Sequence, residues 1–248
     1  MIASLGSKEA TWKGEAVGGM PTGHTARPGF MSHRLILGRT MYVRPVPIRG
    51  RPVWEVIGEY IQALKDLSTK ILDKLTEGLG LPKGYLTETD LNKDDVLTIN
   101  HYPPCPKPSL TIGLPTHTDP TLINLVHATP LDVPGLQLFK DGLWFDLETT
   151  PDSLFVFIGN QLEVISNAKL KAPPHRAVTN AEKPRTTSVY FVNPAMDCVV
   201  EPAKVLLEAD NDRPLYKSFK YGEYFKAHTG AIGDRHDILE KGNFTIKY

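Results

Sequence analysis

The sequence predicts an α+β protein whose core is mainly β, built as a sandwich or jelly roll with one long supporting helix before it. Three observations lead to this prediction. Apolar residues recur three and four positions apart from Trp54 to Leu79, which is typical of an amphipathic helix. Beyond Asp95, short apolar or alternating runs follow one another, separated by turn residues. The 248 residues also include 21 prolines and 20 glycines, which indicates many turns and therefore many short strands.

The first fifty residues differ in character from the rest of the chain. They contain two acidic residues, Glu9 and Glu15, and no sustained apolar periodicity. We expect residues 1–50 to be a poorly structured, atypical leader. A transit peptide is an alternative, because such peptides are also basic and poor in acids, although they are richer in serine than this stretch.

Residues 51–94 are expected to form a helical support region. The apolar repeat begins at Trp54, and lysine and glutamate occupy the opposite face of the helix. Gly78, Gly80 and then Pro82 provide the signals that end it. A helix of this kind packs against a core, so we expect it to support the fold rather than take part in chemistry.

Residues 95–202 are expected to hold the β core. Asp141-Gly142 between two of the apolar runs is a strong signal for a two-residue hairpin. The regular spacing of the runs is typical of a sandwich or jelly roll. The predicted strands are residues 96–101, 123–127, 136–140, 143–147, 154–158, 187–192 and 198–201. Residues 203–248 are expected to be a C-terminal helical extension, with helices at 203–209 and around 216–228.

The composition excludes several classes of partner. Lys plus Arg and Asp plus Glu each total 28, so the formal net charge at pH 7 is zero. This balance argues against binding to nucleic acid or to an anionic membrane surface. The two cysteines, Cys105 and Cys198, are expected to be free thiols in a reducing compartment. A reducing compartment indicates a cytoplasmic location; we also expect a monomer, and the resemblance described below implies a small-molecule partner.

Two histidines and one aspartate form a pattern typical of a metal site. His117 and Asp119 lie two positions apart in a short extended segment, so their side chains point to the same face. His175 follows after several predicted strands and could supply a third ligand. Two histidines and a carboxylate on one face of an octahedron are the facial triad of non-haem Fe(II) oxygenases, which leaves positions open for a cosubstrate and O₂.

A second pattern is suited to binding a carboxylate. Arg185 lies two residues before the hydroxyl of Thr187, and such a pair can grip a carboxylate through the planar guanidinium and one further hydrogen bond. The distal end of a dicarboxylate such as 2-oxoglutarate needs this grip while its 2-oxo acid end chelates iron. Upstream, Asn100 and Tyr102 place an amide and a phenol shortly before the expected ligand strand.

Taken together, these motifs resemble the plant 2-oxoglutarate- and Fe(II)-dependent dioxygenases, which include flavanone hydroxylases, anthocyanidin synthase, gibberellin oxidases and hyoscyamine 6-hydroxylase. The motifs are Asn100-His101-Tyr102-Pro103-Pro104-Cys105, His117-Thr118-Asp119, His175-Arg176 and Arg185-Thr186-Thr187. The similarity runs from about Trp54 to Tyr248. It implies a cupin-like jelly roll, the double-stranded β-helix, and an oxygenase that converts 2-oxoglutarate and O₂ to succinate and CO₂. A small specialised metabolite would be hydroxylated, desaturated or demethylated in the same reaction.

The resemblance also implies a role for individual residues. The metal ligands fall on His117, Asp119 and His175. The contacts to 2-oxoglutarate fall on Arg185, Thr187, Tyr102 and Asn100, and the aromatic residue that flanks the substrate falls on Phe191. The implied cofactors are Fe(II), 2-oxoglutarate as cosubstrate and O₂, and the family also allows ascorbate.

Three departures from the family pattern stand out. Family members usually have a longer N-terminal part that forms one wall of the substrate pocket, so the chain resembles an N-terminally truncated member. The turn before the distal ligand reads Phe157-Ile158-Gly159-Asn160 rather than Asn-x-Gly-Asp, and Pro173-Pro174 directly precede His175. One alternative is therefore a truncated, inactive member that binds metal or 2-oxoglutarate without turnover. Another is a cupin-like binding protein that uses a different metal.

The remaining histidines and cysteines are given structural roles. His101 and His127 lie in strand-like runs, and His228 is expected to be solvated. Cys105 follows two prolines and is expected to be a buried thiol.

Overall fold

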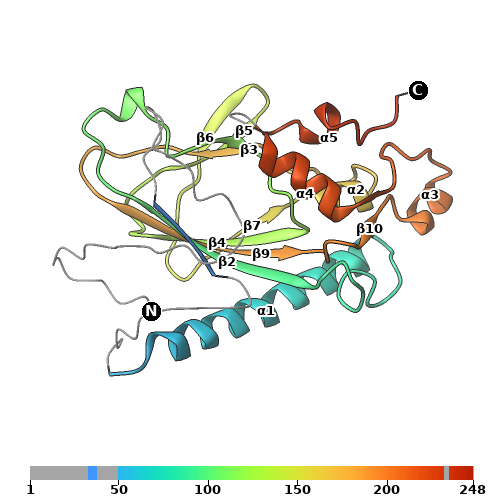
Figure 1. The fold of residues 1–248 in the computed structure, drawn as a ribbon, viewed down its shortest axis with the longest axis horizontal. Helices are drawn as coiled ribbons and strands as arrows, with labels where there is room; N and C mark the ends of the chain where they lie inside the picture. The colour runs from blue at the N-terminus through green and yellow to red at the C-terminus, as the bar shows by residue number, and fades with distance from the viewer. Residues whose placement is uncertain (1–32, 38–49, 232–234, 248) are drawn as a thin grey trace.

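The fold consists of two facing antiparallel sheets with a long helix on the outer side of the larger one (Figure 1). The computed structural model describes residues 33–37, 50–231 and 235–247. Within these residues the larger sheet contains, in spatial order, β1 (His33–Leu37), β2 (Asp94–Tyr102), β9 (Arg185–Asn193), β4 (Ile123–Thr129) and β7 (Phe155–Ile158). The smaller sheet contains β3 (Leu114–His117), β8 (His175–Ala177), β5 (Leu136–Lys140) and β6 (Leu143–Asp146). A third, two-stranded sheet pairs β10 (Val199–Val200) with β11 (Phe219–Lys220).

The helices divide into one long helix and a group of short ones. The long helix α1 (Val53–Gly78) runs along the larger sheet, and the short helices gather at one end of both sheets (Figure 1). The short helices are α2 (Asn160–Ile165), α3 (Lys204–Asp210), α4 (Tyr221–Gly230) and α5 (Ile238–Lys241), and a 3₁₀ turn η1 covers Pro108–Leu110. This arrangement confirms the predicted α+β class with a mainly β core, and the facing sheets form the jelly roll that the motifs implied.

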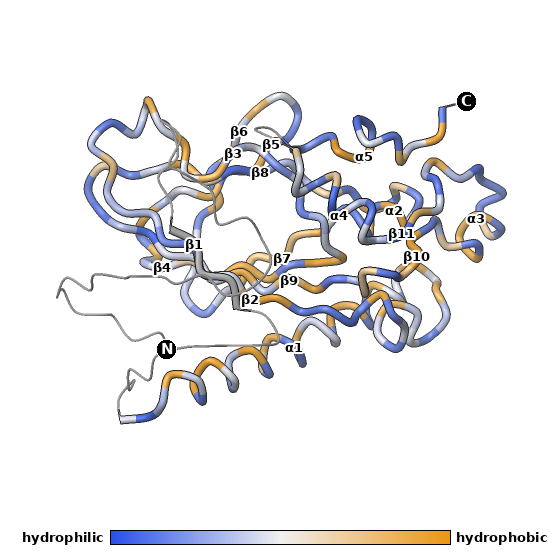
Figure 2. Tube along the Cα trace, viewed as in Figure 1, coloured by the Kyte–Doolittle hydropathy of each residue, from blue (hydrophilic) through white to orange (hydrophobic). Residues whose placement is uncertain are grey.

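Helix α1 packs through the apolar face that its sequence periodicity predicts. Leu64 and Leu72 are buried on this face, and hydropathy alternates along the helix in Figure 2. The Tyr60 hydroxyl and the Ser188 hydroxyl on β9 lie 2.8 Å apart, within hydrogen-bonding distance. Hydrophobic burial and this polar contact together hold the helix on the outer face of the sheet.

The two faces of the larger sheet have different functions. Successive side chains of a strand point to opposite faces. On β9, Tyr190 and Val192 therefore enter the core that α1 covers, while Thr187, Val189 and Phe191 point to the inner face and line a cavity. One strand thus serves the core and the cavity at once.

The predicted hairpin is present between β5 and β6. Asp141 and Gly142 have φ angles of 51° and 80°, the left-handed values that a two-residue hairpin turn of this type requires. The predicted C-terminal helix around residues 216–228 begins later, at Tyr221, because Phe219–Lys220 form β11 first. Strand β8 and helix α2 were not predicted.

Strand β1 falls within the segment expected to be a poorly structured leader. It pairs along β2 from His33 opposite His101 to Leu37 opposite Leu97. Pairing satisfies the backbone N–H and C=O groups that the edge of β2 would otherwise expose. Residues 1–32 and 38–49 of the expected leader lie outside the described residues, so the rest of that prediction is not tested.

Both cysteines are free thiols, and Cys105 is buried as expected. Among the helices of the described residues, none combines the length and apolar character that crossing a bilayer requires.

Truncation of Leu72 to alanine is expected to lower the free energy of unfolding by about 2–5 kcal/mol, because a fully buried leucine in a packed core leaves a cavity behind. Leu67 on the same helix is 38% exposed, so Leu67→Ala is expected to cost less than about 1 kcal/mol. Urea unfolding of both variants and the wild type would measure the difference. Equal losses in the two variants would show that α1 is not packed through its Leu72 face.

Candidate metal centre

Two strand ends bring His117 and His175 together. His117 is the last residue of β3 and His175 is the first residue of β8, and the two are paired directly across the antiparallel ladder. Their ring centroids lie 4.2 Å apart, and both side chains are buried. Strand pairing between β3 and β8 therefore makes neighbours of two histidines far apart in the sequence.

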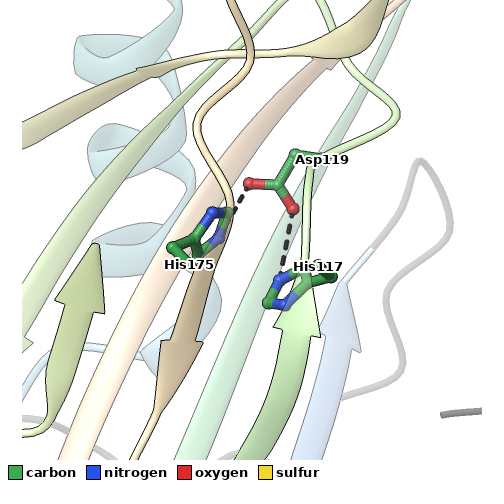
Figure 3. Close-up of side chains that lie close together, drawn as sticks. All are labelled: His117, Asp119 and His175. Atoms are coloured by element: carbon green, nitrogen blue, oxygen red, sulfur yellow. Dashed lines mark ion pairs between the residues drawn. The ribbon is translucent and has the colours of Figure 1, made fainter. Parts of the chain in front are cut away.

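Asp119 completes a cluster of three potential ligands. One of its carboxylate oxygens, Oδ1, lies 3.6 Å from Nε2 of His117, and the other, Oδ2, lies 3.3 Å from Nε2 of His175. Figure 3 shows the carboxylate placed between the two rings. One ligand atom from each residue lies within 4.8 Å of the other two, so the three side chains could hold one metal ion.

The orientation of both rings suits metal binding. Nδ1 of His117 lies 2.7 Å from the Pro115 carbonyl oxygen, and Nδ1 of His175 lies 3.0 Å from the Pro173 carbonyl oxygen. A carbonyl oxygen can only accept, so each Nδ1 carries a proton, and each Nε2 is left to face Asp119 and, in the neutral ring, to ligate a metal ion. Pro173 belongs to the Pro-Pro pair that departs from the family pattern. Its carbonyl nevertheless orients the ring of His175.

The electrostatics of the cluster favour the forms that bind a cation. Burial, with His175 as a neighbour, lowers the pKa of His117 to about 3. Burial would raise the pKa of Asp119, but His175 and His117 outweigh it and hold that pKa below its usual range. Burial would also lower the pKa of His175, but Asp119 outweighs burial and raises it. Asp119 is therefore ionised and His117 neutral, as metal ligands must be.

A tight turn holds the backbone around Asp119. The N–H groups of Gly159, Asn160 and Gln161 donate to the carbonyl oxygens of Leu122, Asp119 and Thr121 at 2.8, 2.8 and 3.0 Å. A Cβ at Gly159 would lie 2.1 Å from the Thr121 carbonyl oxygen, so only glycine fits there. The turn that departs from the family pattern at residues 157–160 therefore still fixes the segment that carries the carboxylate.

Asn124 on β4 fixes the carboxylate itself. Its Nδ2 donates to Oδ2 of Asp119 at 2.7 Å, and both side chains are buried. The sequence analysis did not identify this residue. A signal was present in the sequence, because Asn124 is a polar residue between the apolar residues Ile123 and Leu125 of the strand.

The residues expected to bind a carboxylate lie on two neighbouring strands. Tyr102 on β2 pairs with Arg185 on β9, and Asn100 pairs with Thr187. The Arg185 guanidinium lies 5.8 Å from the centroid of the Tyr102 ring, and Nδ2 of Asn100 donates to the Thr187 hydroxyl at 3.4 Å. The register between β2 and β9 is therefore sufficient to bring the four side chains together.

Arg185 is a buried cation without an acidic partner. Its residue exposure is 4%, burial lowers its pKa, and it forms no ion pair within the described part of the chain. A buried charge is costly unless a counter-charge accompanies it. The site therefore fits an anionic ligand, whose carboxylate would match the planar guanidinium.

One cavity of about 220 Å³ unites the site. Its lining includes all the residues predicted to take part: His117, Asp119, His175, Arg185, Thr187, Tyr102, Asn100 and Phe191. Ser188, next to Thr187, points to the opposite face, towards Tyr60, as strand alternation requires. The structure therefore places every predicted site residue at the same cavity.

The C-terminal helices add residues that the sequence analysis missed. His228 on α4 was expected to be solvated, and this expectation is wrong, since its exposure is 3%. Its Nε2 donates to the Thr118 carbonyl oxygen at 2.9 Å, between the two potential ligands His117 and Asp119. The buried residues of α4 are Tyr221, Tyr224 and His228. They are spaced as on one helical face, and this spacing in the sequence could have indicated that His228 is buried.

Comparison with known proteins gives a consistent result. A family model described as the 2OG-Fe(II) oxygenase superfamily matches residues 93–194. Protein DOWNY MILDEW RESISTANCE 6 of Arabidopsis thaliana is 38% identical over 201 residues, covering 80% of this chain and 59% of that protein. Flavanone 3-dioxygenase 2 of Oryza sativa subsp. japonica is 35% identical over 186 residues (75% and 54%). Hyoscyamine 6-dioxygenase of Hyoscyamus niger is 38% identical over 172 residues (68% and 48%).

A solved structure is also similar. The crystal structure of JOX2 in complex with 2OG, Fe and JA has a TM-score of 0.74 and 28% identity, covering 85% of this chain and 63% of that one. The rice dioxygenase for auxin oxidation, at 20% identity and a TM-score of 0.68, supports the fold alone. The chain spans about half the length of the curated relatives named above, at 59%, 54% and 48%.

Proposed function

Because residues 93–194 form a 2OG-Fe(II) oxygenase domain, as the motifs predicted, we propose that this chain oxidises a C–H bond of a small specialised metabolite. The outcome would be hydroxylation, desaturation or demethylation, with succinate and CO₂ released from 2-oxoglutarate. One observation carries the proposal: a buried His–Asp–His cluster and a buried, unpaired arginine line the same cavity.

We assign the metal to His117, Asp119 and His175. Their donor set, two imidazoles and one carboxylate, is the one that non-haem Fe(II) oxygenases use. A ferrous ion held there would supply the activation of O₂, coupled to the decarboxylation of 2-oxoglutarate. The two proline carbonyls and Asn124 keep the three ligands in one orientation, so that little reorganisation accompanies binding.

The carboxylate subsite would position the cosubstrate. Arg185 and the Thr187 hydroxyl would grip its distal carboxylate, and Tyr102 and Asn100 would border it. Val126, Leu136 and Val189 give the same cavity apolar walls, which exclude water from the reacting groups. Phe191 would flank the substrate.

The names of two relatives, flavanone 3-dioxygenase and hyoscyamine 6-dioxygenase, support a small-molecule substrate. The zero formal net charge supports the absence of a nucleic-acid or membrane partner. We further propose that the chain works as a cytoplasmic monomer, where a reducing environment preserves both free thiols and ferrous iron. Ascorbate would help to keep the iron reduced.

Anaerobic addition of Fe(II) and 2-oxoglutarate is expected to produce a weak visible charge-transfer band, because a 2-oxo acid chelates the metal at this site. Neither component alone should produce it. Adding O₂ and a panel of plant metabolites should then release succinate. A protein that shows no band would contradict the site assignment, whereas a band without O₂-dependent succinate in any member of the panel would favour binding without turnover.

A further inference from the structure

The cavity holds more positive charge than bound 2-oxoglutarate would neutralise. Its described lining includes three arginines, Arg176, Arg185 and Arg235, and one carboxylate, Asp119. The Arg176 side chain is already engaged, since its Nε donates to Oε1 of Gln137 at 2.8 Å and its guanidinium lies 3.9 Å from the Trp144 ring centroid. Two arginines therefore remain to bind anions.

Arg235 lies beside the metal cluster. Its backbone N–H donates to the Thr116 carbonyl oxygen at 3.0 Å, and it forms an isolated parallel bridge with His117. Its side chain is partly buried, and it makes no hydrogen bond or ion pair with any residue in the part of the chain that the structure describes. Arg235 thus resembles Arg185 in making no ion pair, although Asp119 attracts its charge, and it comes from the opposite side of the cavity.

The charges of the proposed complex leave Arg235 without a partner. A ferrous ion and Arg185 together carry three positive charges, which Asp119 and the dianionic 2-oxoglutarate balance, while the Arg176 charge is held by the Gln137 amide and the Trp144 ring. The charge of Arg235 would then remain in a partly desolvated cavity, where an unbalanced charge is unfavourable. One more anion at this wall would balance it.

A second polar group on this wall, the His228 imidazole, also has an atom without a hydrogen-bond partner among the described residues. Because Nε2 of His228 donates to the Thr118 carbonyl oxygen, its Nδ1 is an acceptor, and this buried atom has no hydrogen-bond partner among the described residues. His228 lines the same cavity as Arg235. A ligand seated here would therefore find a cation for an anionic group and, separately, an acceptor for a hydroxyl donor elsewhere on the ligand.

We propose that Arg235 binds an anionic group of the organic substrate, so that this oxygenase acts on small carboxylic acids rather than on their neutral counterparts. The inference rests on the proposed function and adds to it a substrate class and a residue that determines specificity. Arg235 would select the substrate through one charge-assisted contact, while Arg185 selects the cosubstrate.

The test compares matched acids and amides. Two pairs, 3-phenylpropanoate with 3-phenylpropanamide and octanoate with octanamide, would be titrated into anaerobic protein holding Fe(II) and 2-oxoglutarate, with binding measured by calorimetry. For the wild type, at least one acid should bind about tenfold or more tighter than its amide. Arg235→Gln should reduce this preference to within about threefold while the affinity for 2-oxoglutarate changes by less than about threefold. Arg235→Lys should retain part of the preference because it keeps the charge.

Arg213→Gln is the matched control, because Arg213 is exposed and lies outside the cavity lining. It should leave the preference for the acid intact. Equal affinity for acid and amide in the wild type, including failure of both acids to bind, would overturn the proposal. It would also be overturned if Arg235→Gln weakened 2-oxoglutarate as strongly as the acid, since Arg235 would then belong to the cosubstrate.

A second arm separates this inference from the proposed function. The same titrations on metal-free Arg185→Gln protein remove the other free guanidinium from the cavity. A preference for the acid that persists there, and disappears in the Arg185→Gln, Arg235→Gln double variant, would support the anion site even if no Fe(II)–2-oxoglutarate band forms. Loss of the preference in the single variant would place the anion at Arg185 and overturn the proposal.

Discussion

Replacement of Asp119 by asparagine is expected to weaken Fe(II) binding by more than about 100-fold and to abolish succinate release. The substitution keeps the shape of the side chain but removes the one negative charge in the cluster and one of the oxygens proposed to ligate the metal. Losses of groups that merely orient ligands already cost about 10- to 100-fold in affinity, so the loss of a ligand should exceed this range. Calorimetric or competitive titration with Fe(II) under anaerobic conditions would measure it.

Folding of the variant can be checked separately. In the metal-free protein the Asp119 carboxylate is a buried charge that faces His175 and accepts a hydrogen bond from Asn124, and removing one partner of such a buried pair lowers stability. We therefore expect the metal-free variant to melt below the wild type but still to unfold cooperatively, so that its Fe(II) affinity is measured on folded protein. Asp132→Asn is the matched control, because Asp132 is exposed and pairs with Lys183 at the surface. Wild-type Fe(II) affinity in Asp119→Asn would disprove the ligand assignment.

Replacement of Arg185 by glutamine is expected to weaken 2-oxoglutarate binding by about 10- to 100-fold or more, because each hydrogen bond to a charged group is worth about 1.5–3 kcal/mol. Fe(II) binding should remain, since His117 and His175 lie on the smaller sheet and Arg185 on the larger one. Arg185→Lys should be intermediate, as it keeps the charge but loses the planar fork. The visible band, titrated with 2-oxoglutarate, reports these affinities.

Arg176→Gln provides the control for Arg185. Arg176 lines the same cavity, but its guanidinium is held by Gln137 and Trp144. Its replacement should therefore change the affinity for 2-oxoglutarate by less than about threefold. If both variants weakened binding equally, the general positive potential of the cavity, rather than a specific grip by Arg185, would explain the affinity.

The elements with strong local signals were predicted well from the sequence. Helix α1 shows a long apolar repeat, and the Asp141-Gly142 turn requires residues that tolerate positive φ. Strand β8 could not be recognised, because its three residues are too few to show any alternation. Helix α2 was missed because all six of its residues are buried, so it has no polar face to give a helical period.

The site was predicted where its residues form a compact sequence motif. His117 and Asp119 lie in one short segment, as do Arg185 and Thr187, and His175 was the candidate third ligand; the family resemblance then gave these residues their expected roles. Asn124, His228 and Arg235 carry no such motif. Their places depend on the register of β4 and on how the C-terminal helices dock, and both result from tertiary packing rather than from local sequence.

The division of the site between two sheets has a consequence for the lifetime of the protein. The smaller sheet carries His117 and His175, and the larger sheet carries Arg185 and Thr187. A chelate that contacts both would act as a non-covalent crosslink, which must dissociate before the sheets can separate. Iron and 2-oxoglutarate would therefore protect the chain from unfolding and proteolysis. The abundance of the protein would then depend on the supply of the metal and the metabolite as well as on the rate of protein synthesis.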